Sequence, residues 1–117
     1  MADTVTIYHN PRCSKSRQTM ELLEQQNINP TVVKYLDTPP DAATLKSILN
    51  MLGLEPRELM RKGEAEYKEL ALDNPELSQE QLIQAMVENP RLIERPIVIK
   101  GNKAALGRPP EQVLDIL

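Results

Sequence analysis

The order of predicted elements at the N-terminus constrains the fold of this chain more than any other feature. Residues 4–8 alternate and are rich in β-branched side chains, which predicts a strand. A helix is predicted from Ser14 to about Gln26, and a second strand over residues 31–36. Two strands joined by one helix form a βαβ unit, in which the strands run parallel and the crossover is right-handed.

Helices are predicted through the middle of the chain. Residues 38–41 (TPPD) combine a capping residue with prolines and predict a helix start. Apolar side chains then recur at helical spacing up to Gly53, which ends the helix. Three further segments are predicted: a short helix over residues 56–61, a helical turn or two within 64–72, and a helix that follows the Ser78/Gln81 capping box and ends at Asn89–Pro90.

Strands return near the C-terminus. Residues 97–100 and 103–106 flank Gly101–Asn102, a two-residue hairpin signal, and a last helix carries Val113, Leu114 and Leu117. The order β-α-β, helices, β-β-α predicts an α/β fold with a mixed four-stranded sheet, flanking helices and a helical insertion in the middle of the chain. This is a thioredoxin-like architecture, and 117 residues fit a single domain over residues 1–117.

Composition narrows the class of protein. The chain is 40% hydrophobic and 26% charged, as in soluble globular proteins, and the absence of Phe and Trp requires an aliphatic core. Neither a membrane span nor a secretory signal is visible, so we expect a cytoplasmic protein. The net charge of −3 argues against a nucleic-acid partner. No coiled-coil heptad or long exposed apolar strand is present, so we expect a monomer.

Cys13 is the one cysteine, so no internal disulfide can form, and one cysteine with one histidine is too few for a conventional zinc site. It lies between the first predicted strand and helix, with Arg12, Lys15 and Arg17 beside it. The unsatisfied amides of a helix start and nearby cations favour a thiolate, so we expect a pKa below the free value of ~8.5. The same amides would bind an oxyanion. Such a segment favours a reactive thiol over an inert buried one.

Two neighbours of Cys13 each allow two interpretations. Ser16 stands where a dithiol oxidoreductase has its second cysteine, so an adduct on Cys13 must be released by an external thiol. Ser16 either donates a hydrogen bond to the thiolate or is simply a first-turn helix residue. His9, the one histidine, either assists the thiolate and proton transfer or is a strand-end residue bonded to backbone.

Three arginines are candidate oxyanion ligands, because a guanidinium group can make paired hydrogen bonds to an oxyanion. Arg95 precedes Pro96 at the start of the third strand, where thioredoxin-like folds place a cis proline opposite the active-site cysteine. A cis bond would point Arg95 towards Cys13. Arg61 and Arg108 are the other candidates, and each of the three is alternatively a solvated surface residue.

Several segments together resemble the glutaredoxin-dependent arsenate reductase family. The signature is Ile7-Tyr8-His9-Asn10-Pro11-Arg12-Cys13-Ser14-Lys15-Ser16-Arg17, and the likeness continues through residues 35–40, 59–62, 95–98 and 107–109. The resemblance covers nearly the whole chain in register and implies a thioredoxin-like fold with a helical insertion.

The resemblance also implies a chemistry. Cys13 would attack arsenate, with Arg61, Arg95 and Arg108 binding the oxyanion and His9 and Ser16 holding the thiolate. Glutathione as co-substrate and glutaredoxin as protein partner would then complete reduction to arsenite, with no tightly bound cofactor, no metal and no membrane.

Two other functions are compatible with the residues. A monothiol transferase acting on glutathione mixed disulfides would also use the Cys13-x-x-Ser16 arrangement. A redox-responsive regulator that binds RNA polymerase shares the fold, but such proteins use a cysteine pair that this chain lacks. Gly107 stands where some relatives have a cysteine, which indicates a housekeeping branch with arsenate or another natural substrate.

Overall fold

The computed structural model describes residues 4–117. The chain divides into two compact units. The first joins the chain up to Thr38 with Arg95–Leu117, and the second is Pro39–Glu94. The single domain expected over residues 1–117 stays a prediction.

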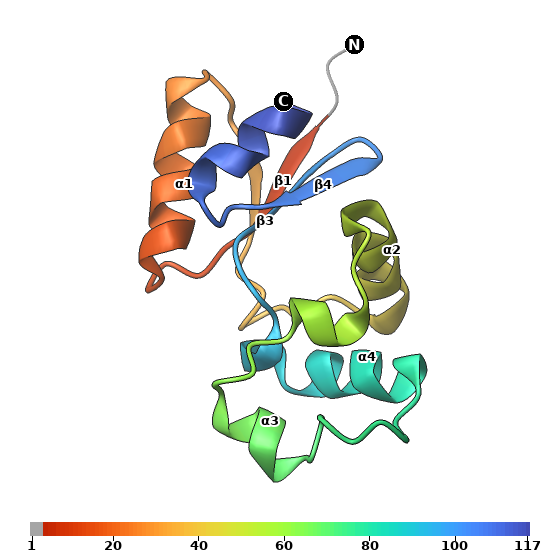
Figure 1. The fold of residues 1–117 in the computed structure, drawn as a ribbon. Coiled ribbons are helices and arrows are strands. Elements are labelled where there is room, and N and C mark those ends of the chain that lie inside the picture. The colour runs from red at the N-terminus through yellow and green to blue at the C-terminus, as the bar shows by residue number, and fades with distance from the viewer. Residues whose placement is uncertain (1–3) are drawn as a thin grey trace. The chain divides into compact units, whose positions relative to one another are not determined.

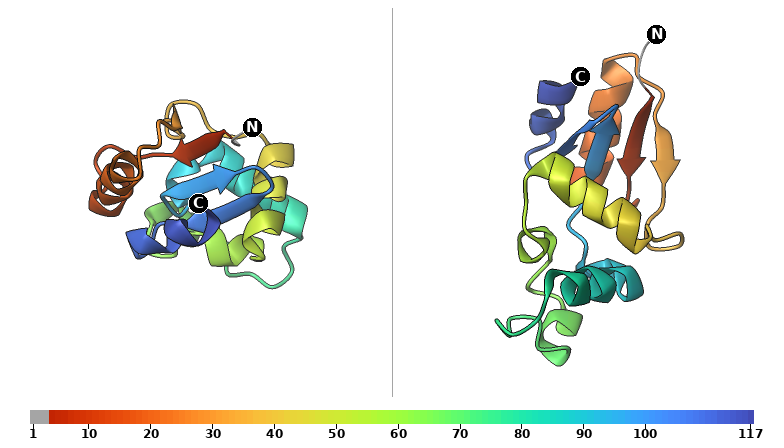
Figure 2. Two further views of the ribbon diagram at one scale, coloured as in Figure 1. Left: turned by 90° about the horizontal axis from the view of Figure 1, so that it is seen from above. Right: turned by 90° about the vertical axis from the view of Figure 1, so that its right-hand side faces the viewer.

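The first unit is built on a four-stranded sheet. Its strands are β1 (Val5–Tyr8), β2 (Thr31–Val33), β3 (Ile97–Lys100) and β4 (Lys103–Leu106), in the order β2-β1-β3-β4. β1 and β2 are parallel, whereas β3 is antiparallel to both β1 and β4. The right-hand view of Figure 2 shows the strands side by side. The predicted mixed sheet is confirmed.

Two helical segments pack against one face of this sheet. They are α1 (Ser14–Gln25) and the 3₁₀ segment η3 (Pro110–Ile116), which lie beside each other in Figure 1. In the sheet Ile7 is paired with Val98, and the two side chains share one face. Leu23 of α1 and Val113 of η3 join them in an apolar cluster, and all four side chains are fully buried. This aliphatic cluster fixes α1, and therefore its N-terminal end, against the sheet.

Two predicted elements of the first unit differ from the structure. The second strand ends at Val33 instead of residue 36, because the amides of Asp37 and Thr38 both donate to the Lys34 carbonyl and form a turn. The last helix is a 3₁₀ segment that begins at Pro110.

The second unit is helical. It contains α2 (Ala42–Leu52), η1 (Pro56–Leu59), α3 (Ala65–Glu69), α4 (Gln79–Glu88) and η2 (Pro90–Leu92). α2 begins later than predicted, because the side chain of Asp41, and not that of Thr38, caps it by accepting a 2.8 Å hydrogen bond from the Thr44 amide. The helix ends at Gly53, as predicted, with a left-handed φ of 69°.

The short helix η1 ends at Leu59 and not at residue 61 as predicted, because Met60 is extended. At the start of α4, Ser78 and Gln81 form the predicted capping box. The segment that follows η1 pairs with the segment at the end of η2. Met60 forms a β-bridge with Ile93, and the Arg61 amide donates to the Leu92 carbonyl at 2.7 Å. This short pairing fixes the backbone that carries Arg61. Within residues 4–117, no helix is both long and apolar enough to cross a bilayer.

Candidate active site

Cys13 lies at the junction between β1 and α1. β1 ends at Tyr8, and the next residues form a turn in which the Cys13 amide donates to the Asn10 carbonyl at 3.0 Å. Asn10 supports this turn by accepting a hydrogen bond on its side-chain oxygen from the Arg12 amide, also at 3.0 Å. Cys13 is the N-cap residue of α1 and is 8% exposed. The turn therefore places the sulfur at the positive end of a helix fixed to the sheet.

The surroundings of Cys13 favour its thiolate. Burial raises the pKa of the thiol, but the backbone N–H groups of Ser16 and Lys15 and the charges of Arg95 and Arg108 together outweigh burial and lower the pKa below its ordinary value. A lowered pKa increases the fraction of nucleophilic thiolate at neutral pH.

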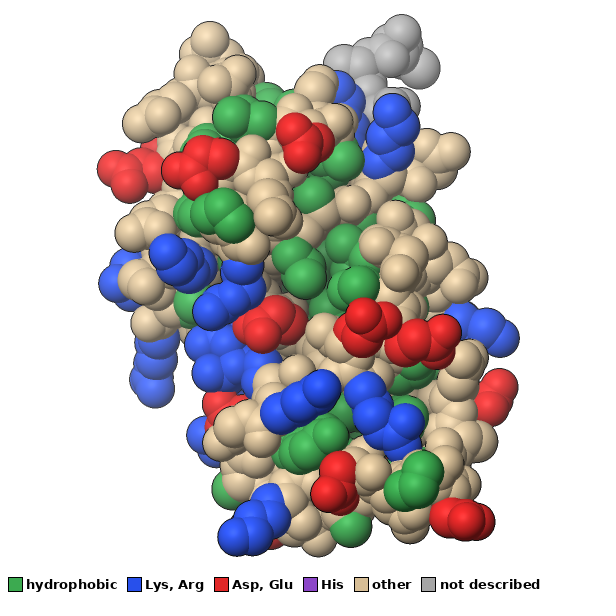
Figure 3. Space-filling view, in the orientation of Figure 1, with side chains coloured by type: hydrophobic (Ala, Val, Ile, Leu, Met, Phe, Trp, Pro, Cys, Tyr) green, Lys and Arg blue, Asp and Glu red, His purple; other side chains and the backbone are tan. Residues whose placement is uncertain are grey.

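Cations also surround this end of α1. Figure 3 shows Lys and Arg side chains gathered over the N-terminal end of the helix. Arg12 and Arg17 are exposed, and the Arg17 guanidinium donates to the Pro11 carbonyl at 3.0 Å, which ties the helix to the loop before it. The predicted cluster of cations around Cys13 is present. The arginines that lower the pKa of Cys13 are nevertheless Arg95 and Arg108, which lie far from it in the sequence.

His9 and Ser16 form a buried pair beside Cys13. Ser16 is fully buried, and its Oγ lies 2.6 Å from Nδ1 of His9. The same Oγ accepts a hydrogen bond from the Asn10 amide at 3.0 Å. Burial, followed by the charges of Lys34 and Arg17, lowers the pKa of His9, so its imidazole is neutral at pH 7.

The pair limits what the Ser16 hydroxyl can do. A hydroxyl has one proton to donate. Where His9 accepts that proton on Nδ1, none is left for Cys13; where His9 donates from Nδ1, the Ser16 proton is available to another acceptor. The backbone amide of Ser16 favours the thiolate in either case. The backbone amide of His9 continues the pairing of β1 by donating to the Val33 carbonyl at 2.8 Å. Its side chain contacts the Ser16 hydroxyl and not a backbone group.

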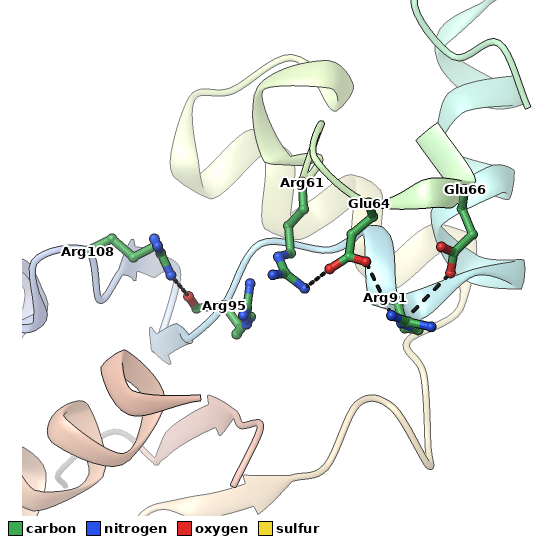
Figure 4. Close-up of polar contacts among 6 residues, drawn as sticks. All are labelled: Arg61, Glu64, Glu66, Arg91, Arg95 and Arg108. Atoms are coloured by element: carbon green, nitrogen blue, oxygen red, sulfur yellow. Dashed lines mark hydrogen bonds and ion pairs between the residues drawn. The ribbon is translucent and has the colours of Figure 1, made fainter. Parts of the chain in front are cut away.

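Arg95 and Arg108 belong to the same unit as Cys13 and both lower its pKa. The Arg95–Pro96 and Arg108–Pro109 peptide bonds are both cis. The Arg108 guanidinium donates to the Arg95 carbonyl at 3.2 Å, as Figure 4 shows. Two of the three arginines predicted from the sequence therefore act on the sulfur from one unit.

Arg61 lies in the second unit, where its partner is an acidic residue. Its guanidinium is 2.5 Å from the Glu64 carboxylate, whose other oxygen lies 3.3 Å from Arg91. Arg91 also approaches Glu66 at 3.9 Å. Figure 4 shows Arg61 and Arg91 on two sides of Glu64. Glu64 was not among the residues predicted for the site, although an acid three residues after an arginine is a recognisable pairing signal.

Gly107 approaches Thr19 and Pro96 closely. A Cβ on Gly107 would lie 2.6 Å from Cγ of Pro96 and closer still to Oγ1 of Thr19, which is fully buried and donates to the Lys15 carbonyl. A side chain at this position would therefore require Thr19 or Pro96 to shift. Thr19 was not predicted from the sequence, because a threonine within a helix gives no signal of such a contact.

Within residues 4–117, no group of three or more His, Cys, Asp or Glu side chains is placed to hold a metal ion.

Comparisons with known proteins give consistent results. A family model described as the ArsC family matches residues 8–116. The uncharacterized protein YfgD of Escherichia coli K12 is 59% identical, covering 100% of this chain and 99% of its own length. An arsenate reductase of Neisseria meningitidis serogroup B is 53% identical and covers 97% of each chain. The solved structure of arsenate reductase from Vibrio cholerae is 55% identical, with a TM-score of 0.97 over 100% of both chains.

Proposed function

Because this chain belongs to the ArsC family, we propose that it is an oxidoreductase that reduces arsenate to arsenite, with Cys13 as the nucleophile. One observation carries the proposal: the backbone amides at the start of α1 and two arginines act together on the one cysteine. Groups that stabilise a thiolate also stabilise an oxyanion that bonds to it. Nucleophile and anion site therefore coincide.

The first step is attack of the Cys13 thiolate on arsenic. A sulfur–arsenic bond forms, and one arsenate oxygen leaves as water after protonation. Arg95 and Arg108 neutralise the charge on the remaining oxygens, which is the role guanidinium groups serve with tetrahedral oxyanions. Arg61 is the third proposed oxyanion ligand, by its match to the family pattern, and Glu64 holds its guanidinium in the absence of substrate.

The second thiol comes from outside the chain, because Cys13 has no partner cysteine. Glutathione adds to arsenic and displaces a second oxygen as water. A glutaredoxin thiolate then attacks the glutathione sulfur and forms a mixed disulfide. The electron pair of the broken sulfur–arsenic bond stays on arsenic, which is reduced from As(V) to As(III). Hydrolysis of the Cys13–arsenic bond releases arsenite and regenerates the thiol.

His9 and Ser16 are proposed to hold the turn that presents Cys13, with the Ser16 amide facing the negative charge. No cofactor or metal takes part in this scheme. Since the proposed scheme depends on glutathione and glutaredoxin, which keep thiols reduced in the cytoplasm, we propose that the reaction takes place there. We propose that the protein acts there as a monomer.

The test is release of arsenite from arsenate by the purified protein. We expect release with glutathione and glutaredoxin present, and loss of steady-state release when either thiol donor is omitted. No release with the complete system would refute the proposal. Faster turnover of a glutathionylated peptide than of arsenate would instead favour a monothiol transferase that uses the same cysteine.

A further inference from the structure

We propose that a pocket beside the active-site turn binds the small peptide thiol that supplies the second sulfur. The inference rests on the proposed function, since it concerns the co-substrate of that reaction. The pocket has a volume of about 370 Å³, and both of its walls belong to the first unit. One wall is residues 9–12, and the other is formed by Lys34, Leu36 and Asp37 from the turn after β2. Its volume is that of a site for a small organic ligand.

The position of the pocket suits a second substrate. Residues 9–12 form the turn that leads directly into Cys13, so a ligand in the pocket contacts this turn, although Cys13 itself is not part of the lining. None of the groups that lower the pKa of Cys13 lines the pocket; those groups are Lys15, Ser16, Arg95 and Arg108. A thiol bound in this pocket therefore need not displace an oxyanion bound at the start of α1. Both ligands can be present at once, as addition of a thiol to an arsenate adduct requires.

The charges in the pocket match a zwitterionic peptide with an excess of negative charge. Arg12 and Lys34 supply two cations and Asp37 supplies one carboxylate. All three side chains are exposed, and within the described residues neither cation takes part in an ion pair. A γ-glutamyl peptide thiol of the glutathione class carries two carboxylates and one ammonium group. Each of its charged groups therefore has a partner of opposite sign, and an arginine can bind a carboxylate through paired hydrogen bonds.

The other residues that line the pocket add no charge to it. His9 lines the pocket but is buried, and its Nδ1 is held by Ser16. Its imidazole is neutral at pH 7, because burial and nearby cations lower its pKa. Leu36, 38% exposed, adds apolar surface for the methylene groups of the peptide. The cations that attract the ligand are therefore Arg12 and Lys34.

Binding of S-methylglutathione tests the pocket without any turnover, because this probe has no free thiol. The variant is Lys34→Glu, and the control is Lys103→Glu, the same charge change at an exposed residue of β4 outside the pocket. We expect binding to the wild-type protein, with affinity lowered about five- to tenfold in Lys34→Glu and changed less than about twofold in Lys103→Glu. No binding to the wild type, or equal binding by the two variants, would overturn the pocket assignment.

Steady-state kinetics then separates this inference from the proposed function. We expect Lys34→Glu to raise the KM for glutathione by the same factor while leaving the KM for arsenate unchanged. Binding of S-methylglutathione that is sensitive to Lys34→Glu, in a protein that releases no arsenite, would support the pocket and refute the proposed function. Arsenate turnover with an unaltered glutathione KM in Lys34→Glu would support the function and refute the pocket.

Discussion

The Oγ of Ser16 lies 2.6 Å from Nδ1 of His9, and both side chains are buried beside Cys13. The contact joins the end of β1 to the first turn of α1, seven residues apart in the sequence. It fixes the turn that carries Cys13 through a side-chain bond, while the Ser16 amide acts on the sulfur. Conformation of the turn and stabilisation of the thiolate therefore depend on different atoms of one residue.

Ser16→Ala separates these two roles. The substitution leaves Nδ1 of His9 and the Asn10 amide without their partner, and burial of unsatisfied polar groups costs about 1–3 kcal/mol in free energy of unfolding. The backbone amide stays, so the pKa of Cys13 should remain below its ordinary value. Denaturant unfolding measures the first effect, and the pH dependence of alkylation measures the second.

Ser14→Ala is the matched control, since Ser14 is an exposed residue of the same helical turn. It should change stability by less than about 0.5 kcal/mol. If Ser16→Ala returns the pKa of Cys13 to that of a free thiol, the hydroxyl and not the amide stabilises the thiolate.

The pH dependence of Cys13 reactivity follows from its lowered pKa. Alkylation by iodoacetamide requires the thiolate, so the rate should rise with pH and level off below the range of a free thiol, whose pKa is ~8.5. Arg108→Ala removes one of the charges that lower the pKa and should move the midpoint to higher pH. A wild-type midpoint at or above that of free glutathione would contradict this account.

His9 predicts a separate pH dependence of stability. Because its pKa is lowered in the folded protein, the unfolded chain binds the proton more readily. The stability from neutral His9 should be complete above the unfolded pKa of ~6.5 and should be lost as pH falls through the lower folded value. Unfolding free energies measured between pH 7.5 and 5 should thus decrease less in His9→Asn than in the wild type. Parallel curves would show that His9 contributes nothing to this pH dependence.

Gly107→Ala should destabilise the first unit. Its new methyl group would overlap Pro96 and Thr19, and such overpacking costs about 1–3 kcal/mol. Gly63→Ala is the control, because a Cβ at Gly63 has no atom within 4 Å and the glycine has no positive φ. Thermal unfolding should show a lower Tm for Gly107→Ala alone. Equal Tm values for the two variants would show that Pro96 and Thr19 shift without cost to accommodate the methyl group.

Glu64 should compete with the substrate for Arg61. Glu64→Gln keeps a hydrogen-bond acceptor but removes the charge that offsets the Arg61 guanidinium. The ion pair is partly exposed, so we expect a modest effect: a KM for arsenate lowered about two- to fivefold, with kcat little changed. Arg61→Ala should instead raise the KM. A raised KM in Glu64→Gln would mean that Glu64 orients Arg61 and does not compete for it.

Much of the fold was predictable from local sequence, because β-branched alternation and helix caps act locally. Alternation located β1, and the Ser78/Gln81 box located the start of α4. The end of β2 was not predictable in this way, since Val33 and Leu36 suit a strand equally well. The strand ends because the Lys34 carbonyl accepts hydrogen bonds from the amides of Asp37 and Thr38, and this turn cannot be recognised from the residue types alone.

The candidate site was predictable at its centre and less so at its edges. A cysteine between a strand and a helix, with cations around it, already indicates a stabilised thiolate. The assignment of the Ser16 hydroxyl to His9 depends on how the turn folds back. Lys34 gave no signal as a pocket residue because residues 34–36, which belong to the turn, were predicted to be strand.

The most direct measurement is arsenate-dependent oxidation of NADPH, coupled through glutathione, glutathione reductase and glutaredoxin, for the wild type and Cys13→Ser. We expect oxidation that depends on arsenate in the wild type and no oxidation above background in Cys13→Ser, because Cys13 is the one cysteine of the chain. Equal activity in the two proteins would contradict the role of Cys13. Absence of activity in both would contradict arsenate reduction itself.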